Sequence, residues 1–152
     1  MSASDQPARR RSVLQARALR LLNAGLVGGH VALAVCLVVF GALHGSYGAL
    51  WALLSGLVTV VFFTIGQGIQ VLVAEAEPKV VFAASMTSYV LRVAGLAGLL
   101  AWAQVWNGRL IGLDPIAVAV TVIAVVIGWL GCEIFVFTRL RIPSFDPPAD
   151  PQ

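Results

Sequence analysis

Charged residues are scarce in this chain. Asp, Glu, Lys and Arg make up 11% of its 152 residues, whereas soluble domains contain about 25%. Hydrophobic residues account for 59%. This composition excludes an ordinary soluble domain and predicts an integral membrane protein. The net charge of +3 does not indicate a nucleic-acid partner, because the basic residues lie at the ends of apolar segments.

Cysteines and catalytic motifs are similarly sparse. The two cysteines, Cys36 and Cys132, lie inside apolar segments without a CxxC or Cys/His spacing, so the sequence supports neither a zinc site nor a disulfide framework. We expect both thiols to be buried like small hydrophobes. A phosphate-binding loop, a nucleophile elbow and an HExxH motif are also lacking. We therefore predict a non-enzymatic protein without a metal or other cofactor.

Long apolar segments dominate the rest of the sequence. A transmembrane helix needs about 20 apolar residues, and lipid allows only helices and closed barrels to span it. The sequence therefore predicts an all-α membrane protein with short loops. Its four transmembrane helices are expected at about residues 21–43, 50–74, 80–106 and 115–138. The basic segment 1–20 and the proline-rich tail 139–152 flank this domain, and we expect the tail to be disordered because it cannot build a core.

Lysine and arginine residues predict the orientation of the helices. Segment 1–20 has five arginines, the second loop has Lys79 and the tail has two arginines, whereas Arg109 alone lies on the opposite side. Cytoplasmic loops carry the excess of basic residues in membrane proteins. Both termini are therefore expected in the cytoplasm. In the simplest interpretation residues 9–20 only set this orientation; a basic helix on the anionic inner leaflet is the alternative.

Arg92 is the residue that most needs an explanation. It lies near the middle of an uncharged segment from Val80 to Trp106. An arginine at the centre of a transmembrane helix costs about 2.5–3.5 kcal/mol on insertion scales. Such a residue requires a partner, a water-filled cavity or a function.

Several other polar residues can reach Arg92 if the helices form a bundle. A rise of about 1.5 Å per residue places Gln67 and Glu133 at intermediate depths on its cytoplasmic side. Side chains lean toward the N-terminus of their helix, so Arg92 and Glu133, on oppositely directed helices, lean toward each other. We predict an intramembrane polar cluster of Arg92, Glu133, Gln67, Ser88 and Tyr89.

Two interpretations of this polar cluster remain open. A buried pair of Arg92 and Glu133 would fix the register of two helices. Alternatively, the cluster would belong to an ion or proton pathway, or would contact the membrane carboxylate of a partner, since intramembrane charge is by default a functional hypothesis. One arginine and one glutamate provide neither a proton relay nor an acidic ring.

Part of the sequence resembles a known family. Residues Val58–Leu100 contain FFTIGQ, a short charged loop with a proline, and SYVLRV, which includes Arg92. Together with GWLGCEIFVFTRLRIP at Gly128–Pro143, this stretch resembles the centre of ATP synthase protein I as it occurs in actinobacteria. The resemblance implies a four-helix protein of the bacterial cell membrane that is made alongside the rotary ATP synthase and helps its c subunits to form a ring. A role in magnesium supply is also attached to that family.

Three functions are compatible with these features. The leading hypothesis is a non-enzymatic accessory or assembly factor for the ATP synthase membrane sector, with the lipid bilayer and the c subunits as partners. A small magnesium-type cation carrier or channel subunit is the alternative, as a homo-oligomer because four short helices make a poor pore alone. A purely structural membrane protein is the third. A transporter is expected to have an acid-lined path or broken helices, and the predicted spans contain one acidic residue.

Overall fold

The protein consists of helices and short connectors over the residues that the structure describes. This computed structural model describes residues 5–139, with side chains from residue 15 onward. Three helices follow one another: α1 (Asp5–Val73), α2 (Pro78–Val105) and α3 (Pro115–Arg139). Each is long and apolar enough to cross a membrane. The predicted all-α class is therefore confirmed for this part of the chain.

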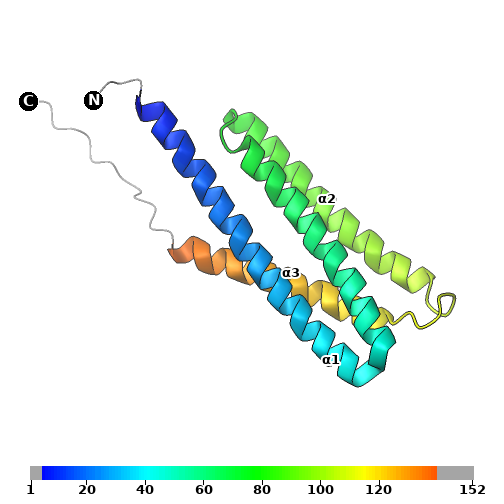
Figure 1. Cartoon of the computed structure of the whole chain (residues 1–152). Helices are drawn as coiled ribbons and strands as arrows, with labels where there is room; N and C mark the ends of the chain where they lie inside the picture. The colour runs from blue at the N-terminus through cyan, green and yellow to red at the C-terminus, as the bar shows by residue number, and fades with distance from the viewer. Residues whose placement is uncertain (1–4, 140–152) are drawn as a thin grey trace, which may run out of the picture.

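In the described residues, three helices and not the predicted four are long and apolar enough to cross a membrane. The number is lower because α1 extends over the first two predicted spans as far as Val73. The chain reverses direction within α1 at Gly45, whose φ of 70° and ψ of −157° are not helical. Figure 1 shows α1 running from its blue N-terminal end to this turn and returning in green beside α2. Glycine adopts a positive φ at little cost, so Gly45 permits the reversal. We call residues 5–44 the first arm and residues 46–73 the second arm.

The connectors also differ from the predicted ones. The expected loop at 44–48 is helical except for one residue. The basic N-terminal segment is not separate, because α1 begins at Asp5 and continues into the apolar part of the first arm. Pro78 and Pro115 are the first residues of α2 and α3, where the missing N–H of proline costs nothing. The disorder that we predict for the tail lies outside the described residues.

The core lies where the first arm crosses α3. The two helices run in opposite directions and their backbones approach closely: a Cβ atom on Gly128 would lie 2.7 Å from the carbonyl oxygen of Gly28. Gly25, one turn earlier, leaves room for the fully buried side chain of Trp129. The second arm completes this cluster through Phe63, whose ring centroid is 5.5 Å from that of Trp129.

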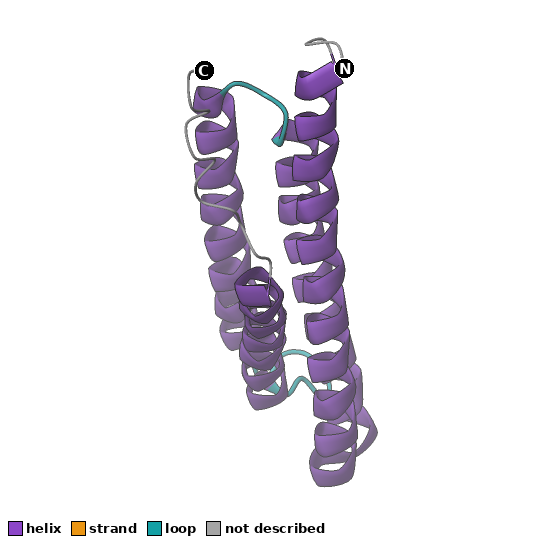
Figure 2. Ribbon diagram, turned by 90° about the vertical axis from the view of Figure 1, so that its left-hand side faces the viewer, coloured by secondary structure: helices purple, strands orange, loops and turns teal. Residues whose placement is uncertain are grey.

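Helix α2 packs more loosely than α3. Its buried residues are only Ser88 and Ala103, whereas α3 buries six residues. In Figure 2, α3 points toward the viewer, with α1 on one side and α2 on the other. Most of α2 therefore presents its apolar side chains outward, among them Phe82, Met86 and Tyr89, where lipid or another membrane protein would cover them.

The close crossing predicts that two Gly→Ala substitutions differ strongly in their effect on the Tm. A Cβ on Gly28 would clash with the carbonyl oxygen of Gly128 and lie 2.7 Å from Sγ of Cys132. Overpacking of this kind costs about 1–3 kcal/mol, so we expect Gly28→Ala to lower the Tm in detergent. Gly131→Ala is the control, because no atom lies within 4 Å of its added Cβ. Equal Tm values for the two variants would contradict the crossing.

Candidate functional site

Arg92 lies where α2 packs against the second arm. Its guanidinium carbon is 4.8 Å from the centroid of the Phe63 ring, which is a cation–π distance. The guanidinium also fills the space next to Gly66, where a Cβ would clash with Nε and lie 2.8 Å from Nη2 of Arg92. The missing side chain of Gly66 therefore creates a seat for the arginine on α1.

Ser88 joins the same contact, one helical turn before Arg92. Its hydroxyl group donates a hydrogen bond to the carbonyl oxygen of Gly66 over 3.1 Å, and the residue is 1% exposed. Two successive turns of α2 thus contact one glycine of α1. Tyr89, which we also predict in the cluster, is 65% exposed and makes no hydrogen bond to the described residues; it points away from the bundle.

The other members of the predicted cluster connect α1 to α3. The Nε2 atom of Gln67 donates a hydrogen bond to Oε1 of Glu133, and both side chains are partly buried. Because Gln67 directly follows Gly66, adjacent residues of the second arm contact the glutamate of α3 and the arginine of α2. The second arm is therefore the common support of the cluster.

The direct pair that we predict between Arg92 and Glu133 does not form. No nitrogen of Arg92 lies within the 4.0 Å ion-pair distance of a Glu133 oxygen. The physical reason is that the guanidinium packs against Gly66 and stacks on Phe63 of α1, while an oxygen of the glutamate accepts a hydrogen bond from Gln67.

The guanidinium of Arg92 consequently has no hydrogen-bond acceptor in the described part of the chain. Its Nε and Nη2 atoms are buried without a partner, so Nη1 is the nitrogen that remains accessible. Arginine has five N–H donors and no acceptor, and a buried charge is costly unless it is paired. The site can therefore donate to one further acceptor at Nη1, where a carboxylate would accept a charge-assisted hydrogen bond.

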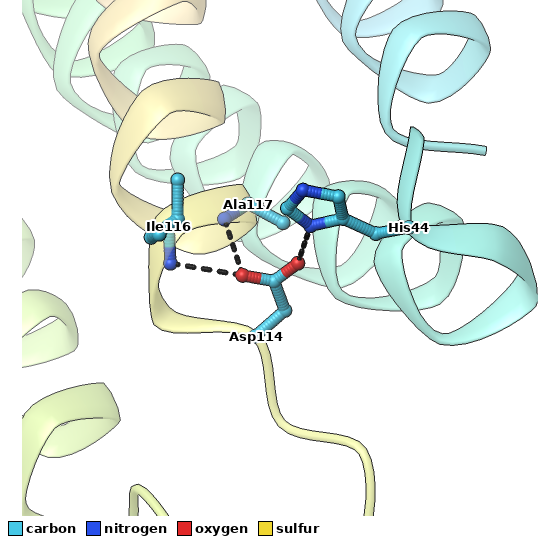
Figure 3. Close-up of polar contacts among 4 residues, drawn as sticks. All are labelled: His44, Asp114, Ile116 and Ala117. Carbon is cyan, nitrogen blue, oxygen red and sulfur yellow. Dashed lines mark hydrogen bonds and ion pairs between the residues drawn. The ribbon is translucent and has the colours of Figure 1, made fainter. Parts of the chain in front are cut away.

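A second polar site lies at the turn of α1, and the sequence does not single it out. Nδ1 of His44, the last residue of the first arm, contacts Oδ2 of Asp114 (Figure 3). The other oxygen of Asp114, Oδ1, accepts hydrogen bonds from the backbone N–H groups of Ile116 and Ala117, each over 3.0 Å. One carboxylate thus caps α3 and ties its start to the α1 turn.

These two residues border a cleft of about 500 Å³, which Tyr47, Gln104 and Asn107 also line. An Asp-Pro pair before an apolar segment is a signal for a helix N-cap, so the sequence could have revealed the capping role of Asp114. No pattern in the sequence pairs it with His44. Within the described residues, no group of three or more His, Cys, Asp or Glu side chains could hold a metal ion.

The contacts of Asp114 change its acidity. Partial burial raises the pKa of this carboxyl, but the hydrogen bonds from His44 and from the N–H groups of Ala117 and Ile116 outweigh burial, so its pKa lies below the ordinary value. The ionised form of Asp114 is therefore the form that the fold stabilises.

In comparisons with protein families, curated proteins and solved structures, this chain has no match. Its function must therefore be inferred from its own residues and geometry.

Two substitutions of Glu133 separate its hydrogen bond from its charge. Glu133→Gln retains an oxygen that can accept from Gln67, whereas Glu133→Leu removes it. Interhelical hydrogen bonds in membrane proteins contribute about 0.6 kcal/mol on average and at most about 1.7 kcal/mol. We expect Glu133→Leu to lower the Tm in detergent, and Glu133→Gln to lower it less. If both variants lose the same stability, then the charge, and hence the attraction to Arg92, outweighs the hydrogen bond.

Asp114 predicts a pH dependence of stability. Because its pKa is lowered in the folded protein, the ionised carboxylate stabilises the fold above the ordinary Asp pKa of about 3.9. This stabilisation is lost as the pH falls through the lower folded-state pKa. We expect the Tm advantage of the wild type over Asp114→Asn to be full above about pH 5 and to disappear in acid. A difference that does not change with pH would show that the charge of Asp114 is irrelevant.

Proposed function

We propose that this protein is a non-enzymatic accessory factor of the membrane, and that Arg92 binds the carboxylate of another membrane protein. The observation that carries this proposal is the guanidinium without an acceptor among the described residues. A charged donor that is held between helices at a cost needs a compensating interaction. The only acidic residue on the neighbouring α3, Glu133, is already bonded to Gln67.

The depth of Arg92 favours a protein carboxylate over a lipid phosphate. Arg92 is fourteen residues after Pro78 and thirteen residues before Val105 in α2, which corresponds to about 20 Å from either end of the helix. The hydrocarbon core is about 30 Å thick, so Arg92 would lie near its middle. An arginine near a helix end can extend to the headgroups, but one at this depth is too far from them. An acidic side chain on a partner helix can reach it.

The ATP synthase membrane sector is the first partner that we propose. The support is the resemblance of Val58–Leu100 to ATP synthase protein I, and this stretch includes Arg92, its seat at Gly66 and its neighbour Ser88. An assembly factor for the c-subunit ring would need to hold a membrane helix temporarily, and a single charge contact on the loosely packed α2 suits reversible binding.

We further propose that both arms of α1 cross the membrane, so that the chain has four crossings with both termini in the cytoplasm of a bacterial cell. The support is the reversal at Gly45 and the excess of basic residues on one side. Reporter fusions after Gln152 and within 44–47 test it. An exported C-terminus would contradict it.

Affinity purification tests the proposed role of Arg92. We expect the wild type, in mild detergent, to recover ATP synthase membrane subunits, and Arg92→Leu to lower this recovery about tenfold, the equivalent of a lost contact worth about 1.4 kcal/mol. Arg109→Leu is the matched control, because Arg109 lies in the connector before α3, with its guanidinium 6.0 Å from the Trp106 ring.

One outcome of this purification, and one outcome of a separate gene deletion, would contradict the proposal. Equal recovery by the wild type and Arg92→Leu would exclude Arg92 as the contact. Unchanged ring assembly in a deletion strain, together with a lost cation flux, would favour the cation-carrier alternative.

A further inference from the structure

A groove lies between the first arm and the C-terminal part of α3. It has a volume of about 450 Å³ and is almost entirely apolar. The first arm contributes Arg20, Asn23, Ala24 and Val27, and the end of α3 contributes Cys132, Phe135 and Val136. The groove is distinct from the Arg92 cluster, which lies between α2, α3 and the second arm.

Positive charge gathers at one end of this groove. The first arm and α3 run in opposite directions, so Arg20 at its rim lies at the same end as Arg139, the last residue of α3. The guanidinium of Arg139 stacks on Phe135, a groove residue, at 4.8 Å from the ring centroid. Arg17 lies one turn beyond Arg20. All three are without an ion pair among the described residues.

The groove carries no compensating negative charge in the part of the chain that the structure describes. Between Gln15 and Val73, α1 has no acidic residue, and the only one in α3 is Glu133, whose carboxylate is bonded to Gln67 of the second arm. The arginines of the rim are therefore not balanced by an acidic side chain of these two helices in the described residues, and an anion can pair with them.

The shape and the charge together match one kind of ligand. From Arg20 to Val27 the first arm rises by about 10 Å, so the groove begins at a charged rim and continues as an open apolar surface along the helix. A phospholipid has this same order, with its phosphate outermost and its acyl chains below. Basic pockets between transmembrane helices on the cytoplasmic side are sites for anionic lipid headgroups.

We propose that this groove binds one anionic phospholipid, with its phosphate between Arg20 and Arg139 and an acyl chain along Val27 and Phe135. A diffuse attraction between arginines and the membrane surface would not require the groove. A lipid bound in the groove needs both the rim charges and the open space beside Ala24.

Native mass spectrometry of the purified full chain tests this proposal. The protein is incubated with equal amounts of phosphatidylglycerol and phosphatidylcholine in mild detergent, and the bound lipids are counted. We expect the wild type to retain phosphatidylglycerol preferentially. One arginine near a membrane surface contributes about fivefold to binding, so Arg20→Gln and Arg139→Gln should each reduce the preference about fivefold. Arg109→Gln is the control and should leave it unchanged.

A third variant tests the groove independently of charge. Ala24→Leu would fill part of the apolar groove while leaving both arginines in place. We therefore expect it to reduce the amount of phosphatidylglycerol that the protein retains. Equal retention of the two lipids by the wild type would overturn the proposal even if the variants fail to fold. So would an equal loss in Arg109→Gln, which would indicate non-specific charge, or full retention in Ala24→Leu, which would indicate surface binding without the groove.

Discussion

The close approach of two helix backbones, at Gly28 of α1 and Gly128 of α3, determines much of the remaining structure. With no side chains between them, the first arm and α3 come close enough for Trp129 to be completely buried next to Gly25. The same crossing sets the rotation of α3 about its axis. Glu133, one turn after Trp129, is therefore directed at the second arm. Both the polar cluster and the lipid groove therefore depend on this contact.

The polar cluster is unbalanced, since its glutamate has a donor while its arginine lacks an acceptor in the described residues. The stacking on Phe63 offsets part of the cost of Arg92, because a desolvated cation–π contact contributes about 2 kcal/mol. This is of the same order as the cost of placing an arginine at mid-membrane. Arg92 is carried by α2, which buries only Ser88 and Ala103. A partner helix could therefore engage Arg92 from the side of α2 without disturbing the core.

Hydropathy and the helix rise predicted the features that depend on the length of a helix and on the depth of a residue in the membrane. The all-α class follows from the apolar segments, and Gln67 and Glu133 meet because the rise per residue fixes their depths. The predicted pair of Arg92 and Glu133 fails because depth carries no information about rotation around a helix axis. The seat at Gly66, which depends on that rotation, draws the guanidinium onto α1 instead.

The turn at Gly45 and the site beside it show a different limit. The polar stretch at 44–48 predicted a loop, but a single glycine with positive φ is sufficient to reverse the helix. His44 and Asp114 both lie in connectors that the sequence predicts at the same end of the bundle. Their contact depends on how close the reversal of α1 at Gly45 lies to the start of α3. No local pattern in the sequence encodes that distance.

Photocross-linking from position 89 in living cells tests most directly whether Arg92 meets a partner carboxylate. Tyr89 lies on α2 one turn from Arg92 and is 65% exposed, so a photoreactive phenylalanine analogue there would sample whatever covers this surface. We expect an adduct with a membrane protein whose cross-linked helix contains an intramembrane Asp or Glu, and loss of that adduct when Arg92→Leu is added. Adducts with lipid alone, or a protein adduct that persists in Arg92→Leu, would contradict it.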